Sequence, residues 1–131
     1  MYTRGMTTHG KILIVEDDAL LRASLVKQFE RAGYTVATAE DGVRGIAMFE
    51  SEKPDIVLSD ILMPGMDGIE MLEAIKAKWP DTHVPFIMLT TSDDIGYVAS
   101  AMDKGALAYL LKSDNEIDAI VKAVEAKLAH S

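Results

Sequence analysis

The chain has 131 residues, of which 49% are hydrophobic and 26% charged, a balance typical of one folded globular domain and not of a disordered chain. Its net charge of −8 repels phosphate backbones and anionic lipid surfaces, so direct binding to nucleic acid or to a membrane is not expected. The chain has no cysteine, no apolar run as long as the ~18 residues of a membrane helix and a start too polar for a signal peptide. These features exclude disulfides, thiolate metal sites and membrane spans, and we expect a cytoplasmic protein.

The elements follow one another in a regular alternation. Residues 1–10 have no hydrophobic period, and we expect a flexible leader there. Over residues 11–129, which we expect to form one domain, short apolar runs alternate with helical patterns, as in βαβ units around a parallel sheet. Strands are expected near 11–15, 34–39, 55–59, 84–89 and 107–111, and helices near 18–32, 42–51, 67–79, 94–104 and 114–129.

Two helix starts and one helix face have a clear chemical signature. Asp67 with Glu70, and Ser113 with Glu116, have the spacing of capping boxes. The last helix has an apolar stripe that we expect to pack on the sheet as core, formed by Ile117, Ile120, Val121, Val124 and Leu128.

The order of the strands follows from their burial patterns. Residues 34–39 alternate between apolar and polar, as an edge strand can, whereas 11–15, 55–59 and 84–89 are more uniformly apolar, as interior strands are. The doubly wound order 2-1-3-4-5, which is flavodoxin-like with helices on both faces, satisfies this pattern. In such a sheet, ligands bind at the carboxyl ends of strands 1 and 3.

Polar residues follow four of the apolar runs directly. They are Glu16 and Asp17, then Asp60, Thr90 and Lys112. If the runs are parallel strands, three carboxylates, a hydroxyl and an ammonium share one pocket, and the like charges destabilise one another. A hard divalent cation such as Mg²⁺ would relieve this repulsion through oxygen ligands and leave room for a phosphate group. The pattern therefore indicates metal-assisted phosphoryl chemistry.

These residues and their context resemble the receiver domain of two-component response regulators, over about residues 11–128. The resemblance is carried by the acidic run Val15–Asp18, by Thr90 and Lys112, and by the segment Ser59–Gly68, which contains the string D-x-x-M-P-G-x-D-G. Because the sequence ends with the last helix at about residue 129, we expect a stand-alone receiver without an output domain. Its output would come from partners or self-association, including a phosphorylation-dependent dimer. The partners would be a sensor histidine kinase or a histidine phosphotransfer protein, and a downstream protein that the sequence does not identify.

The resemblance also implies roles at the metal and at the phosphorylated residue. Asp60 would be the phosphoacceptor, taking a phosphoryl group from a phosphohistidine to give an aspartyl phosphate. Mg²⁺, with Mn²⁺ as an alternative, would be held by Asp17, Asp60 and the backbone carbonyl of Leu62, with Glu16 acting through a coordinated water. Asp18 stays outside this set, as an amide acceptor or a charge in the first helical turn.

Phosphoryl binding and switching would involve two strands. Lys112 and Thr90 would bind phosphoryl oxygens, and Thr90 would also sense the modification. Tyr109 stands where the family has an aromatic switch, so that phosphorylation would change the face formed by helix 4, strand 5 and helix 5. The alternative is that Tyr109 is an ordinary half-buried tyrosine on an edge strand.

The chain departs from the family pattern at the rim of the pocket. Ser113 replaces the usual proline after Lys112, so we expect a trans Lys112–Ser113 peptide, because a cis bond without proline costs about 2.5–4 kcal/mol. Thr91 replaces a smaller alanine and would narrow access to the pocket. The resemblance implies that Leu62 and Ser92 would flank the path of hydrolytic water. Since an apolar Leu62 cannot orient that water, we expect slow dephosphorylation.

Three other functions are alternatives to a phosphorylated switch. A receiver-fold adaptor that works without phosphorylation remains an alternative. An aspartate-based phosphatase of the haloacid dehalogenase type needs a second aspartate at position 62, where the chain has Leu62. A flavodoxin-like FMN carrier needs a phosphate loop after the first strand, where Glu16 and Asp17 would repel the phosphate. We expect a phosphoacceptor switch and not an enzyme with a separate substrate.

Overall fold

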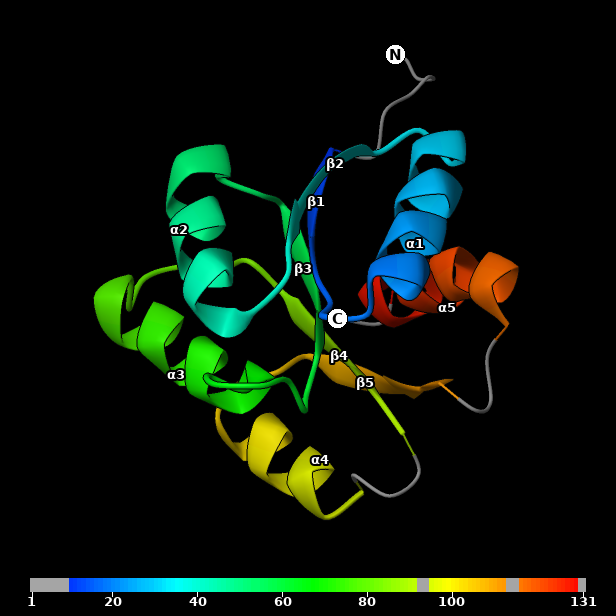
Figure 1. Ribbon diagram of the computed structural model, residues 1–131. Coiled ribbons are helices and arrows are strands. Elements are labelled where there is room, and N and C mark those ends of the chain that lie inside the picture. Colours follow the sequence, from blue (N-terminus) through cyan, green and yellow to red (C-terminus); the bar gives the residue numbers. More distant parts are fainter. Residues whose placement is uncertain (1–9, 92–94, 113–115, 130–131) are drawn as a thin grey trace.

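The computed structural model describes residues 10–91, 95–112 and 116–129 (Figure 1). The strands are β1 (Lys11–Val15), β2 (Thr35–Ala39), β3 (Ile56–Asp60), β4 (Phe86–Thr90) and β5 (Ala108–Leu111). The helices are α1 (Ala19–Arg31), α2 (Gly42–Glu52), α3 (Gly68–Lys78), α4 (Ile95–Asp103) and α5 (Ile117–Ala129). Every predicted element is present, with bounds that differ by a few residues at most. None of the helices described here combines the length and hydropathy needed to cross a membrane.

The strands form one parallel sheet in the order β2-β1-β3-β4-β5, which confirms the predicted topology. The alternating strand β2 lies at one edge, as its pattern predicted. Helices α1 and α5 cover one face of the sheet, while α2, α3 and α4 cover the other (Figure 1). Both faces are therefore buried, as in a doubly wound fold.

The core is divided into two layers by the sheet, because successive side chains of a strand point to opposite faces. In β1, Ile12 and Ile14 pack toward α1 and α5, whereas Leu13 and Val15 pack toward α2 and α3. The predicted stripe of α5 belongs to the first layer: Ile120, Val121 and Val124 are buried, and Ile117 and Leu128 are partly buried against them. The stripe is core, as predicted.

Side-chain caps begin two helices near the carboxyl ends of the strands. Asp18 caps α1 by accepting from the amides of Leu20 and Leu21, at 3.0 and 3.1 Å, which confirms its reading as an amide acceptor. Asp67 and Glu70 form the predicted capping box at the start of α3. The second predicted capping box depends on Ser113, which lies outside the described residues.

Candidate functional site

The strand register brings the predicted site residues to one edge of the sheet. Val15 is in register with Ser59, so the next residues, Glu16 and Asp60, come level with each other at the carboxyl ends of β1 and β3. On the other side of β3, Asp60 is in register with Leu89, the residue before Thr90. This edge is the topological switch point of the sheet, where ligands bind in doubly wound folds.

Three carboxylates gather at this switch point. Glu16, Asp17 and Asp60 each place a carboxylate oxygen within 4.8 Å of the others. Glu16 and Asp60 are buried, with 1% and 6% of their surface exposed, whereas Asp17 is exposed. The cluster is therefore closed by protein on one side and open to solvent at Asp17.

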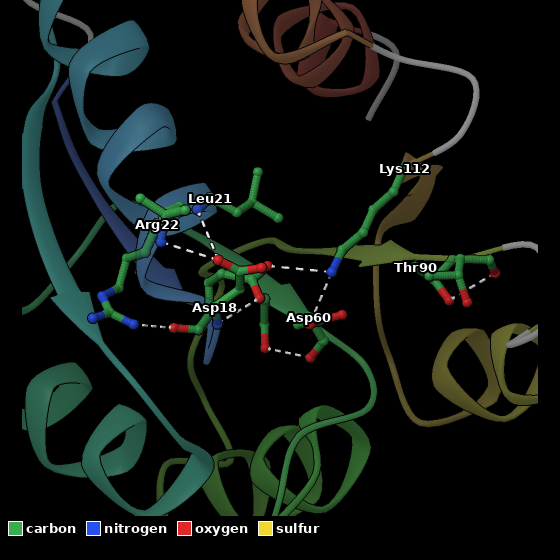
Figure 2. A network of polar contacts seen from close by, with 10 residues as sticks. Asp18, Leu21, Arg22, Asp60, Thr90 and Lys112 are labelled. Carbon is green, nitrogen blue, oxygen red and sulfur yellow. Dashed lines mark hydrogen bonds and ion pairs between the residues drawn. The ribbon is translucent and has the colours of Figure 1, made fainter.

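The ammonium of Lys112 lies against the two buried carboxylates (Figure 2). Its Nζ is 3.0 Å from Oδ2 of Asp60, with a hydrogen bond, and 3.4 Å from Oε1 of Glu16. Lys112 directly follows β5, two strands away from β3, so its long side chain reaches back across the end of β4. One lysine thus offsets part of the charge of three carboxylates.

Burial and charge determine how the cluster titrates. Burial raises the pKa of Glu16 to about 7, with the negative charge of Asp60 acting in the same direction and Lys112 against it. Burial also raises the pKa of Asp60, although the hydrogen bond and charge of Lys112 oppose the shift. For Lys112, burial lowers the pKa, but its contacts with Asp60 and Glu16 outweigh burial and leave the pKa above its usual value. At neutral pH the metal-free cluster thus holds a proton on Glu16 for part of the time.

The donor set fits a hard divalent cation. All three ligand groups are carboxylates, which suit Mg²⁺ better than softer metals. Glu16 Oε1 is buried and has no hydrogen-bond partner among the described residues, although it lies within ion-pair distance of Lys112. A buried oxygen without a hydrogen bond is costly, and a cation or its bound water would satisfy it.

The loop between β3 and α3 is held close to Asp60 by a glycine. The Gly68 amide donates to the carbonyl of Ile61 at 2.7 Å, and a Cβ at residue 68 would collide with the backbone carbonyl oxygen of Asp60. Earlier in the loop, Gly65 has a φ of +75°, which a glycine adopts without strain. Leu62 lies in the same loop with 43% of its surface exposed.

The remaining predicted residues occupy β4, β5 and the segments that follow them. Thr90 ends β4 fully buried, and its hydroxyl donates to the carbonyl of Thr91 at 3.3 Å; Figure 2 shows it on the β4 side of Asp60. Tyr109 is half-buried in β5 and packs against the core layer under α2 to α4. Thr91 is exposed. Ser92 and the Lys112–Ser113 peptide lie outside the described residues, so the expectations for them stay predictions.

One contact of the site loop was not anticipated from the sequence. The guanidinium of Arg22, one turn into α1, donates from Nη1 to the main-chain carbonyl of Glu16 at 2.7 Å (Figure 2). An arginine at this place in an amphipathic helix is most often a solvated charge, and no motif marked it. The only available signal was its position one helical turn beyond the acidic run.

Comparison with known proteins identifies the family. The family model described as "Response regulator receiver domain" matches residues 12–125. The chain belongs to this family. The receiver is 37% identical over 121 residues to "Probable transcriptional regulator ycf27" of Guillardia theta, a match that covers 91% of this chain and 46% of that protein. It is 39% identical over 121 residues to "DNA-binding transcriptional regulator NtrC" of Salmonella typhimurium, covering 92% of this chain and 25% of that protein. The chain thus spans between a quarter and a half of the length of these relatives.

Solved structures of receivers have the same fold. The chemotaxis response regulator CheY4 of Vibrio cholerae superposes with a TM-score of 0.82 at 28% identity, over 92% of this chain and 99% of that one. Full-length FixJ from B. japonicum superposes with a TM-score of 0.81 at 32% identity, over 94% of this chain and 59% of that one. The similar structures therefore include both a stand-alone receiver and a longer protein.

Membership in the family indicates the general function of the acidic pocket. Receiver domains are phosphoacceptors in two-component signalling, and in general they partner histidine kinases. The cluster of Glu16, Asp17 and Asp60 is typical of the Mg²⁺ site of a receiver. Residues 12–125 of this chain therefore form a receiver domain, a phosphoacceptor module of two-component signalling.

Proposed function

We propose that this receiver is a switch that accepts a phosphoryl group onto Asp60 in a Mg²⁺-dependent reaction. The donor would be a phosphohistidine on a sensor histidine kinase or a histidine phosphotransfer protein. The observation that carries the proposal is the nearly buried Asp60 carboxylate, which has Lys112 at 3.0 Å and Glu16 and Asp17 within 4.8 Å.

In the proposed reaction, Asp60 attacks the phosphorus atom of the donor. A bond forms between an Asp60 carboxylate oxygen and phosphorus, the bond from phosphorus to the imidazole nitrogen breaks, and the imidazole keeps that electron pair. Lys112 contacts Asp60 Oδ2, and its ammonium would balance negative charge on the phosphoryl oxygens during transfer. The Thr90 hydroxyl would turn from the Thr91 carbonyl to donate to a phosphoryl oxygen.

The metal would be held by the acidic cluster and the loop after β3. Asp17, Asp60 and the backbone carbonyl of Leu62 would be its ligands, with Glu16 acting through a coordinated water. When bound, Mg²⁺ or Mn²⁺ supplies positive charge that offsets repulsion between the carboxylates and the phosphoryl group and polarises that group. The buried Glu16 Oε1, which has no hydrogen-bond partner within the described part of the chain, supports this assignment.

The proposed output is a change at the face formed by α4, β5 and α5. Movement of Thr90 toward the phosphoryl group would leave room for Tyr109 to turn inward from the edge strand β5. Tyr109 is half-buried, and its strand pairs directly with β4, so the two residues are on neighbouring strands. A downstream protein or a second copy of the chain would bind the altered face. A complex with a phosphate mimic in which Tyr109 stays outward would count against this switch.

Phosphorylation of matched variants tests the proposal directly. Wild type, Asp60→Asn and Asp18→Asn would be incubated with Mg²⁺ and a small-molecule phosphodonor, and the gain of one phosphoryl group followed by intact mass. Asp18→Asn is the control, because asparagine keeps the cap of α1 and changes the same charge next to the cluster. We expect wild type and Asp18→Asn to be labelled and Asp60→Asn to stay unlabelled.

Two results would overturn the proposal in different ways. Equal labelling of wild type and Asp60→Asn would show that another residue is modified. No labelling of wild type, even with candidate histidine kinases, would favour the alternative of an adaptor that works without phosphorylation.

A further inference from the structure

Arg22 reaches from the first turns of α1 back to the end of β1. Its Nη1 donates to the main-chain carbonyl of Glu16 at 2.7 Å (Figure 2). Its own amide donates to the carbonyl of Asp18 at 2.9 Å as part of the helix. The side chain is half-buried. An arginine cation therefore spans the loop that carries two of the three clustered carboxylates.

The contact adds to two other hydrogen bonds of Glu16. The Glu16 amide donates to the carbonyl of Ala39 at the end of β2, at 3.0 Å, and the Glu16 carboxylate accepts from the Asp18 amide at 3.2 Å. Arg22 binds the main-chain carbonyl, so the amide and the carbonyl of Glu16 are both hydrogen-bonded. Because that carbonyl belongs to the peptide between Glu16 and Asp17, its orientation also determines the direction in which the chain continues to Asp17.

A second arginine nearby lacks this contact. Arg44 on α2 lines the same hollow of about 320 Å³ as Arg22, beside the end of β2. Its side chain is 62% exposed and pairs with Glu40 at 3.2 Å and Asp41 at 2.6 Å, both at the start of α2. The two arginines thus bring the same charge to one hollow, but Arg22 binds the site loop whereas Arg44 binds the start of its own helix.

We propose that Arg22 is a positioning residue of the metal site. By binding the Glu16 carbonyl, it fixes the peptide that joins Glu16 and Asp17, and so the spacing of these carboxylates from Asp60. A guanidinium suits this role because it stays charged and makes strong hydrogen bonds to carbonyl oxygens. The inference rests on the proposed function, because it concerns the same Mg²⁺ site.

Binding of Mg²⁺ alone, measured by titration calorimetry, tests this role on wild type, Arg22→Gln, Arg22→Lys and Arg44→Gln. We expect Arg22→Gln to weaken Mg²⁺ binding about tenfold, the effect of losing one charge-assisted hydrogen bond. Arg22→Lys should recover part of this loss, since an ammonium can still donate one bond. Arg44→Gln, which removes the same charge from the same hollow, should change the affinity by less than about twofold.

Amide hydrogen exchange of the metal-free variants provides a second readout that does not depend on phosphorylation. Exchange at the Glu16 and Asp17 amides should become faster in Arg22→Gln than in Arg44→Gln, after correction for global stability by urea unfolding. Equal Mg²⁺ affinities of Arg22→Gln and wild type, with unchanged exchange at these amides, would overturn the role of Arg22 alone. A wild-type protein that binds no Mg²⁺ would instead overturn the proposed function.

Discussion

The raised pKa of Glu16 predicts an unusual dependence of stability on pH in the metal-free protein. In the folded chain, Glu16 keeps its proton up to about pH 7, whereas in the unfolded chain it loses the proton near its usual value of 4.5. Between these values the folded state binds more protons than the unfolded state, so the free energy of unfolding falls as pH rises. The stabilisation from this group is complete below pH 4.5 and lost above about pH 7.

The size of the effect follows from the difference between the two pKa values. A separation from 4.5 to about 7 corresponds to roughly 3 kcal/mol of unfolding free energy. Since Glu16 is only 1% exposed, solvent screening does not reduce this figure much. Glu16→Gln has no proton to lose, so its stability relative to wild type should increase by roughly 3 kcal/mol between about pH 5 and pH 8.

Urea unfolding followed by circular dichroism, in EDTA and at several pH values, measures this difference. Glu73→Gln is a suitable control, because it removes the same carboxyl group from an exposed position on α3 that pairs with Lys104. Parallel curves of unfolding free energy against pH for wild type and Glu16→Gln would refute the reasoning. They would mean that burial of Glu16 beside Asp60 does not retain a proton.

Three other substitutions have defined expectations. Lys112→Met removes the cation next to Asp60 and should slow labelling by a phosphodonor by roughly a hundredfold; an unchanged rate would contradict its role. Leu62→Asn supplies a group that can orient water and should speed decay of the phosphorylated form severalfold, whereas an unchanged or slower decay would argue against that role. Gly68→Ala places a methyl group against the Asp60 carbonyl and should lower the free energy of unfolding by about 2 kcal/mol; stability equal to wild type in urea would show that the loop relaxes.

The fold could be predicted from the sequence because its signals are periodic and local. The alternation in residues 34–39 marked β2 as an edge, and the apolar stripe of α5 marked its buried face, and the structure confirms both. The gathering of Glu16, Asp17 and Asp60 was also predictable. In a parallel sheet the carboxyl ends of the strands lie at one edge, so residues that directly follow the strands have to meet there.

The details of the site depend on side-chain orientation, which periodicity does not determine. The sequence gives no indication that Glu16 is buried while its neighbour Asp17 is exposed, nor that Thr90 donates to the Thr91 carbonyl. The hydrogen bond from Arg22 to the Glu16 carbonyl could not be predicted either, because it depends on one of many arginine rotamers. Its acceptor is a main-chain group, which every residue type has. The roles of Tyr109, Leu62 and Ser92 stay predictions.

A proton on Glu16 and the proposed cation would each reduce the negative charge of the carboxylate cluster. In the metal-free chain, burial of Glu16 and the negative charge of Asp60, which Lys112 offsets only in part, raise the pKa of Glu16 to about 7 and keep a proton on it near neutral pH. A phosphoryl group adds negative charge, which Lys112 alone does not balance. Because a bound divalent cation needs deprotonated carboxylates, proton and metal compete for the cluster, and metal binding releases the proton. Asp60→Asn removes a negative charge that raises the pKa of Glu16. The same loss of negative charge should also weaken the binding of a cation to the cluster.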